Sequence, residues 1–298
     1  MTSIQVKISR RLLRLLFASW SKSSIAEQRA KQEAQTRFTR LPRHLLCQPV
    51  TVNGIPSEWI ALPGADSRVI LYLHGGGYCL GSINASRNLI ARLVEATKYK
   101  TLAIDYRLAP ENPFPAALED AVAAYRWLLE EGVAPFRILL AGDSAGGGLA
   151  IATLVALRDA GLPRPAGAIC ISPWVDLALA GESIRSRAAA DPILDAATLA
   201  RYAAAYAGNA PLNSPLISPL YADLSGLPPL LIQVGTEEIL LDDAIRLAER
   251  ARQAGVSVTL EQWQGLFHVF QAVPFLPESR QALAQIANYC ARLPAVSG

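Results

Sequence analysis

A serine between small residues is the first candidate for chemistry in this chain. The sequence Gly-Asp-Ser-Ala-Gly at residues 142–146 fits the G-x-S-x-G pattern. It follows the apolar run 138–141 and precedes a helical pattern, so we expect Ser144 on a sharp turn between a strand and a helix. Glycines permit that turn, and the helix N-terminus directs free amides toward developing negative charge. A nucleophilic serine is predicted; the alternatives are a purely structural glycine turn or a phosphate-binding loop, although no Walker-type lysine follows.

A second glycine-rich motif, His-Gly-Gly-Gly at residues 74–77, follows the apolar run 69–73. Acyl transfer requires hydrogen-bond donors at the position where the tetrahedral oxyanion develops, and consecutive glycines let the bare backbone approach a substrate there. We therefore predict an oxyanion hole formed by the amides of Gly76, Gly77 and Ala145.

The chain contains three histidines, and only His268 lies after Ser144. In a fold with this type of serine turn, the chain order is serine, acid, histidine, so His268 is predicted to be the general base. A histidine buried only for packing is the alternative, which the two glycine motifs disfavour. His74 precedes the serine, and with Gly75 it is expected to shape the oxyanion loop.

The acid that orients His268 should follow the apolar run 230–234. Four carboxylates lie there: Glu237, Glu238, Asp242 and Asp243. Their alternative role is to form the charged start of a helix, with Asp242 as the N-cap. The residues alone leave this choice open.

The elements that must position these residues alternate between strand and helix, which is the pattern of an α/β fold with a mostly parallel sheet. We expect strands at residues 69–73, 101–106, 138–141, 168–172, 230–234 and 256–262. We expect helices at residues 87–97, 116–130, 149–158, 242–254 and after 277. Residues 1–45 have a helical pattern, Asn53-Gly54 indicates a hairpin, and residues 174–220 interrupt the alternation as an insertion.

Composition favours one large globular domain, with 298 residues of which 51% are hydrophobic and 18% charged. The net charge of +3 is small and gives no indication of a nucleic-acid partner. Four widely spaced cysteines without a C-x-x-C pair favour neither a zinc site nor a disulfide framework, so we expect a cytoplasmic protein.

The N-terminal segment carries Arg10, Arg11 and Arg14 among leucines. Its apolar stretch is too short for a bilayer span, is interrupted by Arg14 and lacks a small-residue cleavage site. We predict an amphipathic helix that packs as a lid on the protein body, without stable membrane insertion. Contact with a membrane surface is the alternative.

These motifs together resemble the bacterial hormone-sensitive lipase family of esterases over nearly the full chain. The resemblance rests on both glycine motifs and on three further stretches: Asp-Tyr-Arg-Leu-Ala-Pro-Glu at 105–111, Pro-Phe-Pro-Ala at 113–116 and Ser-Pro-Leu at 218–220. It implies an α/β-hydrolase fold, with an eight-stranded, mostly parallel sheet flanked by helices. Residues 46–298 would form the catalytic domain, and residues 1–45 with an insertion at about 174–220 would form a helical cap.

The resemblance also implies a function: a serine carboxylesterase for short- to medium-chain acyl esters that uses no metal or cofactor. Family members often dimerise through the edge strand, here residues 256–262. The family's Asp-Pro-Leu-Arg-Asp segment aligns with Glu-Ile-Leu-Leu-Asp at 238–242, which implies Glu238 as the acid. Glutamate departs from the usual aspartate, so its neighbours stay open as alternatives.

Two other functions are compatible with the same motifs. A lactonase or amidase would use the same triad. A ligand-binding module is a further alternative, because plant gibberellin receptors resemble this family without being hydrolases. Those receptors lack the triad histidine, whereas His268 is present here.

Overall fold

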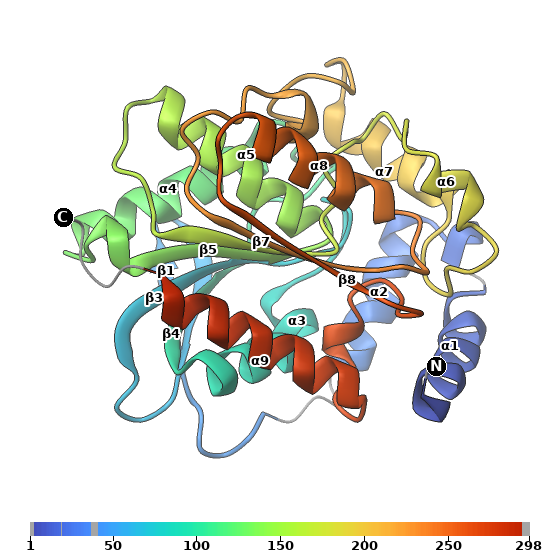
Figure 1. Ribbon diagram of the computed structural model, residues 1–298, viewed down its shortest axis with the longest axis horizontal. Coiled ribbons are helices and arrows are strands. Elements are labelled where there is room, and N and C mark those ends of the chain that lie inside the picture. Colours follow the sequence, from blue (N-terminus) through green and yellow to red (C-terminus); the bar gives the residue numbers. More distant parts are fainter. Residues whose placement is uncertain (1–2, 19, 37–40, 294–298) are drawn as a thin grey trace.

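Eight strands form one sheet in the computed structural model of the chain, which describes residues 3–18, 20–36 and 41–293. The strands lie in the order β1-β2-β4-β3-β5-β6-β7-β8 (Figure 1). Their bounds are β1 Leu46–Val52, β2 Ile55–Ala61, β3 Asp66–Leu73, β4 Tyr99–Ile104, β5 Ile138–Asp143, β6 Gly167–Ile171, β7 Leu230–Gly235 and β8 Val258–Trp263. From β4 to β8 neighbouring strands are parallel, so the predicted mostly parallel sheet is confirmed.

The antiparallel part of the sheet is the hairpin of β1 and β2, with β2 also antiparallel to β4. Asn53 and Gly54 form the turn, with φ angles of 49° and 85°. Both residues of a type I′ turn need positive φ, which asparagine and glycine adopt most readily. The predicted hairpin is therefore confirmed.

Helices cover both faces of the sheet (Figure 1). Alternate residues of β3 show the two cores that result, since Leu71 and Leu73 belong to one buried cluster whereas Ile70 and Tyr72 belong to the other. Burial on both faces explains why the parallel strands have continuous apolar sequences. The covering helices are α3 Ile83–Thr97, α4 Ala116–Glu130, α5 Ala145–Asp159, α8 Leu241–Gln253 and α9 Pro277–Arg292.

Two helices begin four residues earlier than the sequence predicted. Helix α5 starts at Ala145, and the glycines that follow it form its first turn. Glycine has a low helix propensity, which is why the sequence indicated a later start. Helix α3 starts at Ile83, where the Ser82 hydroxyl accepts a hydrogen bond of 3.1 Å from the Ala85 amide. The strand expected to extend to residue 106 ends at Ile104, and the side chain of the next residue, Asp105, accepts from the Ile83 amide at 2.6 Å.

The remaining helices gather at the end of the sheet toward which the parallel strands point (Figure 1). The N-terminal ones are α1 Ile4–Phe17, η1 Trp20–Lys22 and α2 Ile25–Thr36; residues 41–45 are not helical, contrary to the prediction for 1–45. Between β6 and β7 lie α6 Ser183–Ser186, α7 Ala196–Ala207 and η3 Pro219–Tyr221. Short 3-10 turns η2 Pro135–Arg137 and η4 Phe270–Ala272 complete the description.

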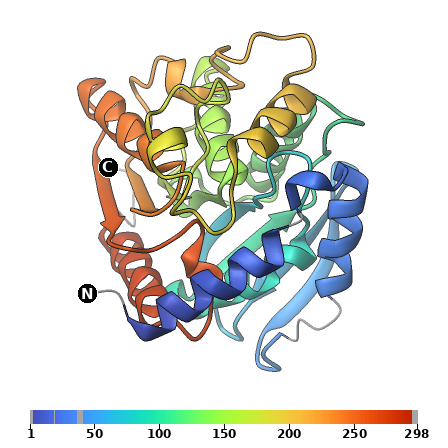
Figure 2. The same ribbon diagram turned by 90° about the vertical axis from the view of Figure 1, so that its right-hand side faces the viewer.

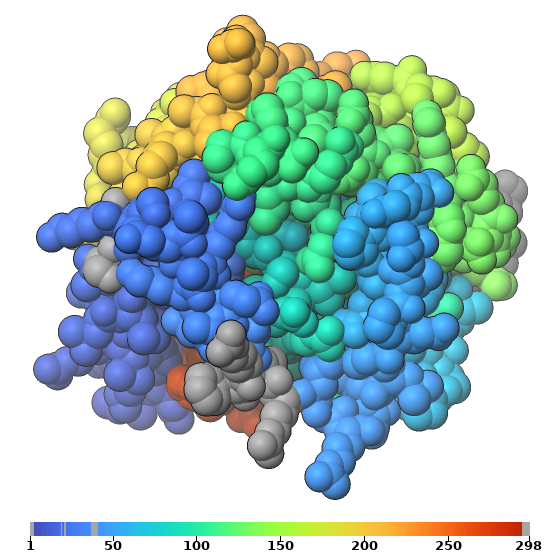
Figure 3. Space-filling view, turned by 180° about the vertical axis from the view of Figure 1, so that it is seen from behind, coloured from blue at the N-terminus to red at the C-terminus, as the bar shows by residue number. Residues whose placement is uncertain are grey.

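The N-terminal helices and the segment between β6 and β7 pack against each other (Figure 3). Tyr202 of α7 joins them, because its hydroxyl accepts from Trp20 Nε1 at 3.2 Å and donates to Gln28 Oε1 at 2.6 Å. Two stretches far apart in sequence thus form one layer over the strand ends. Within the described ranges, no helix is long and apolar enough to cross a membrane.

Candidate active site

The glycine motifs meet because β3 and β5 are neighbours in the sheet. Leu73 at the end of β3 lies opposite Gly142 near the end of β5, so the loops that follow the two strands start side by side. A Cβ atom on Gly146 would collide with the backbone oxygens of Leu73 and His74. Glycine is therefore required at this position for the two motifs to approach.

Ser144 lies on the predicted sharp turn between β5 and α5, with φ 54° and ψ −122°. A positive φ is unfavourable for serine and persists only where surrounding contacts enforce it. Two backbone hydrogen bonds do so: the Ser144 amide donates to the Ile171 carbonyl at 2.8 Å, and its carbonyl accepts from the Trp174 amide at 3.0 Å. The turn holds the Ser144 side chain in a pocket.

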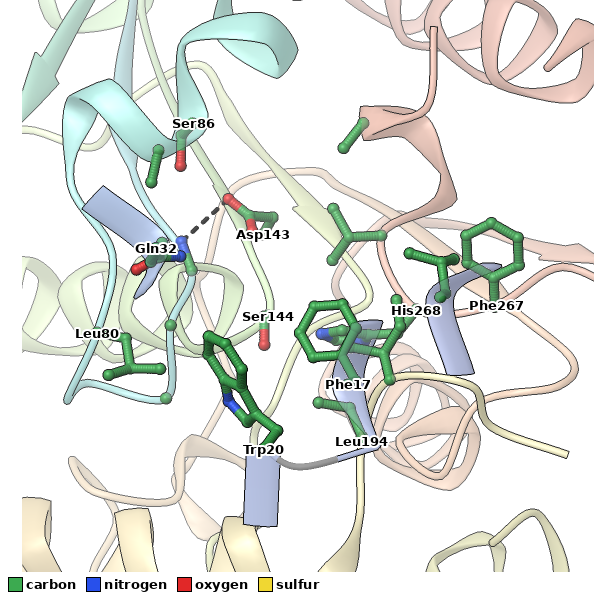
Figure 4. Close-up of a pocket in the computed structure, with 18 of the residues that line it drawn as sticks. Phe17, Trp20, Gln32, Leu80, Ser86, Asp143, Ser144, Leu194, Phe267 and His268 are labelled. Carbon is green, nitrogen blue, oxygen red and sulfur yellow. Dashed lines mark hydrogen bonds between the residues drawn. The ribbon is translucent and has the colours of Figure 1, made fainter. Parts of the chain in front are cut away.

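That pocket has a volume of about 360 Å³, and Ser144 and His268 both line it (Figure 4). Its other walls are largely apolar and come from both glycine loops and the helical layer. The N-terminal helices contribute Leu13, Phe17 and Trp20 to the lining. Helix α7 contributes Thr198, Leu199 and Tyr202. A small uncharged molecule with an apolar chain fits such a site.

His268 is hydrogen-bonded to Glu238, with 2.7 Å between Nδ1 and Oε2. The other carboxylate oxygen of Glu238 accepts from the Ser172 hydroxyl at 2.8 Å and the Gly235 amide at 2.6 Å. Glu238 is fully buried, and these three bonds fix its carboxylate in one orientation. Because an ionised carboxylate only accepts, Nδ1 carries the proton and Nε2 is left as the acceptor.

The other three candidate carboxylates have different partners. Glu237 lies 3.5 Å from the Arg10 guanidinium, Asp242 accepts from the Ser183 amide at 2.9 Å, and Asp243 accepts from two amides after β6. Helix α8 begins before Asp242, so the alternative of Asp242 as its N-cap is wrong. Among the described residues, only Glu238 of the four bonds to the imidazole.

The surroundings of His268 favour its cationic form. Burial by itself lowers its pKa, but the hydrogen bond with Glu238 and the negative charges of Glu238, Asp191 and Asp143 outweigh it, so the pKa of His268 lies above its ordinary value. A histidine that gains a proton during a reaction is stabilised by such a field.

His74 lies behind the oxyanion loop and does not line the pocket. Its Nδ1 donates to the Gly75 carbonyl at 2.8 Å, and its ring stacks on Tyr106 with 4.2 Å between centroids. Burial lowers the pKa of His74, which keeps the ring neutral. Gly75 in turn donates its amide to Asp143 Oδ1 at 3.0 Å (Figure 4). These contacts hold the loop in shape.

Gly76 and Gly77 line the pocket directly. Gly76 has a φ of 125°, where only glycine is unstrained, and a Cβ there would collide with the Leu80 carbonyl. Across the part of the chain that the structure describes, the amides of Gly76, Gly77 and Ala145 donate to no other residue. Three donors are thus available beside Ser144.

Sequence reasoning missed two residues that hold Glu238 and His268 in place. The Ser172 hydroxyl donates to Glu238 and accepts from the Val269 amide at 3.1 Å, so it joins the acid to the residue after His268. The Asp191 carboxylate accepts from the Ile239 amide at 2.9 Å, directly beside Glu238. Neither Ser172 nor Asp191 belongs to a motif that the sequence reveals.

No metal site accompanies these groups in the described part of the chain. Nowhere in that part do three or more histidine, cysteine, aspartate or glutamate side chains form a cluster that could hold an ion.

The fold and the pocket are those of an α/β-hydrolase. Comparison with known proteins agrees, since a family described as alpha/beta hydrolase fold matches residues 70–272. An acetyl-hydrolase of Streptomyces hygroscopicus is 52% identical over 235 residues, covering 78% of this chain and 79% of that protein. An esterase of Acinetobacter venetianus is 38% identical over 248 residues, covering 83% and 82% respectively.

A crystal structure of an esterase from the bacterial hormone-sensitive lipase family is similar over almost the whole chain. Its TM-score is 0.94 and its sequence identity 45%, with 98% of this chain and 99% of that chain covered. This chain belongs to the bacterial hormone-sensitive lipase family of α/β-hydrolase-fold esterases and is a carboxylic ester hydrolase. The family and the fold predicted from the sequence are confirmed.

Proposed function

We propose that this enzyme hydrolyses short- to medium-chain acyl esters with Ser144 as nucleophile, His268 as general base and Glu238 as the acid that orients it. The hydrogen bond of 2.7 Å between His268 and Glu238, at the edge of the pocket that contains Ser144, is the observation that carries the proposal. It gives the imidazole the tautomer that a base needs.

In the first step, His268 Nε2 takes the proton of the Ser144 hydroxyl while Oγ attacks the ester carbonyl carbon. The oxyanion of the tetrahedral intermediate accepts hydrogen bonds from the amides of Gly76, Gly77 and Ala145. The intermediate collapses as the C–O bond to the alcohol breaks, and the imidazolium gives its proton to the departing alcohol oxygen. Ser144 is left acylated.

In the second step, His268 removes a proton from a water molecule, and the hydroxide attacks the acyl carbon. The same amides hold the second oxyanion. When this intermediate collapses, the bond to Ser144 Oγ breaks and His268 returns its proton to the serine. The carboxylic acid leaves and the enzyme is restored.

The pocket supports short and medium acyl chains because it is apolar and limited to about 360 Å³. The similarity to an acetyl-hydrolase supports the short end of this range. Phe17 and Trp20, which pack edge to face with 5.1 Å between ring centroids, narrow the side of the pocket formed by the N-terminal helices.

Ser144→Ala tests the assignment, with Ser86→Ala as the matched control because Ser86 also lines the pocket (Figure 4). We expect Ser144→Ala to lower kcat for p-nitrophenyl butyrate by about 10⁶-fold and to abolish labelling by a fluorophosphonate. Ser86→Ala should keep both. Undiminished turnover by a clean Ser144→Ala preparation would refute the proposal.

Three further assignments belong to this proposal. Residues 1–45 and about 174–220 act together as the cap of a catalytic domain at 46–298. A homodimer forms through β8, an edge strand of the sheet. The enzyme works in the cytoplasm without a nucleic-acid partner, which its four free cysteines support.

A further inference from the structure

Helix α1 packs on the protein through one narrow face. Val6 and Ser9 are buried, and Leu13 and Phe17 line the active-site pocket. These positions recur every three or four residues, so they lie on one side of the helix. This face holds α1 against the protein body at the pocket.

The outward face of α1 is apolar too. Seven large hydrophobic side chains stand out as exposed in the described residues, and five of them are on this helix. They are 52–70% exposed and share one side of α1: Ile4, Ile8, Leu12, Leu15 and Leu16. In Figure 2 helix α1 lies at the front of the molecule, with no other element in front of it. We name these five residues the outer face.

A basic stripe lies beside the outer face: Lys7, Arg10, Arg11 and Arg14. The spacing of three and four residues places these side chains together on α1, which contains no acidic residue. Arg10 and Arg14 donate to the carbonyls of Ala190 and Ala189, at 3.0 and 2.7 Å, and so fix the helix to the segment after β6. Lys7 and Arg11 are exposed and have no carboxylate partner within the described ranges.

A helix at the surface of a protein in water normally exposes polar residues opposite its buried face. Helix α1 instead exposes a continuous row of leucines and isoleucines beside positive charge, which is the arrangement of helices that lie in a lipid interface. A second copy of the chain could cover the outer face, but pairing two such faces would bring two basic stripes close together. Charge complementarity therefore favours an anionic surface.

We propose that α1 docks on an anionic phospholipid surface. Its outer face enters the boundary between headgroups and acyl chains, while Lys7 and Arg11 contact the phosphates. Because Leu13 and Phe17 on the opposite side of the helix line the pocket, docking brings the pocket wall to the lipid surface, where ester substrates with acyl chains accumulate. Docking itself requires no hydrolysis and does not depend on the function proposed above.

Co-sedimentation with vesicles tests the proposal. The parent protein is the full chain with Ser144→Ala, so that lipid hydrolysis cannot affect the result. We expect binding to vesicles of phosphatidylcholine mixed with phosphatidylglycerol, and weaker binding to pure phosphatidylcholine. Leu12→Gln with Leu15→Gln should lower the partition coefficient by roughly tenfold or more. Lys7→Gln with Arg11→Gln should lower it by roughly tenfold on the anionic vesicles only.

Leu46→Gln is the matched control, because Leu46 is 58% exposed, against 53% for Leu12, but lies on β1 at the other end of the molecule (Figure 1). It should bind as the parent does, and circular dichroism with thermal melting checks that every variant is folded. The proposal is wrong if the parent stays in the supernatant or if the leucine substitutions leave the partition coefficient unchanged. It is also wrong if the parent binds anionic and neutral vesicles equally well. It is also wrong if, without vesicle binding, the parent forms a dimer that the leucine substitutions dissociate.

Discussion

Replacing Glu238 with glutamine tests most directly how the pocket is arranged. The substitution keeps the size of the side chain but removes the negative charge 2.7 Å from His268 Nδ1. The Ser172 hydroxyl and the Gly235 amide both donate to the other oxygen, so glutamine must place its carbonyl oxygen there. Its NH₂ group then faces His268, which forces Nδ1 to accept and moves the imidazole proton to Nε2.

Two effects determine how much activity Glu238→Gln should lose. Opposite charges about 4 Å apart interact by about 4 kcal/mol at an effective dielectric of about 20, which corresponds to about 10³-fold in rate. The wrong tautomer adds to this, because Nε2 must first lose its proton before it can accept one from Ser144. We expect kcat/KM for a p-nitrophenyl ester to fall by about 10³- to 10⁴-fold.

Glu237→Gln and Asp242→Asn are the matched controls, because these two carboxylates lie close to Glu238 in the sequence but bond to Arg10 and the Ser183 amide. Each should stay within about threefold of the parent. The reasoning fails if Glu238→Gln stays within about tenfold of the parent while its thermal melting is unchanged. A large loss in Asp242→Asn instead would transfer the role to that residue.

The remaining predictions concern the pH dependence of the rate, the hydrogen bond that Ser172 donates to Glu238, and the preference for acyl-chain length. The pKa of His268 is raised above its ordinary value of 6.5, and a general base must be neutral to act. We therefore expect kcat/KM to fall as the pH drops through a value above 6.5. A decline of kcat/KM that begins only below pH 6 would contradict this. Ser172→Ala should lower kcat/KM by about tenfold with little change in KM, since the charged Glu238 loses one donor; an unchanged rate would exclude a supporting role. Trp20→Ala should widen the pocket and raise the rate ratio of octanoate to acetate esters by roughly tenfold; a constant ratio would mean that Trp20 does not limit the chain.

That Ser144 and His268 would meet in one pocket could be predicted from the sequence, because local patterns determine their places in the chain. A glycine is needed wherever a Cβ would strike the neighbouring loop, as at Gly146, and this requirement is visible in the sequence itself. Strands buried on both faces appear as continuous apolar runs, so most elements were found, with errors mainly at their ends. Glycines at the start of α5 and the Ser82 cap of α3 account for the larger errors.

The choice among four carboxylates required the structure, because it depends on where each side chain is directed after the chain has folded. All four lie within seven residues of one another. Glu238 is selected by contacts with β6 and β7, since Ser172 and Gly235 hold its second oxygen and leave the first for His268. Neither contact leaves a sequence pattern, because Ser172 is 66 residues away from the acid.

The segment after β6 contacts the residues around Glu238 as well as lining the pocket. Asp191 accepts from the Ile239 amide, and the neighbouring Ala190 carbonyl accepts from Arg10 of α1. A displacement of this segment would therefore disturb the loop that holds Glu238 and the helix that lines the pocket together. Since the carboxylate of Asp191 also raises the pKa of His268, its position affects the basicity of the imidazole. In the proposed mechanism, substrate binding under the helices and proton transfer at Ser144 are thus linked through one short stretch of chain.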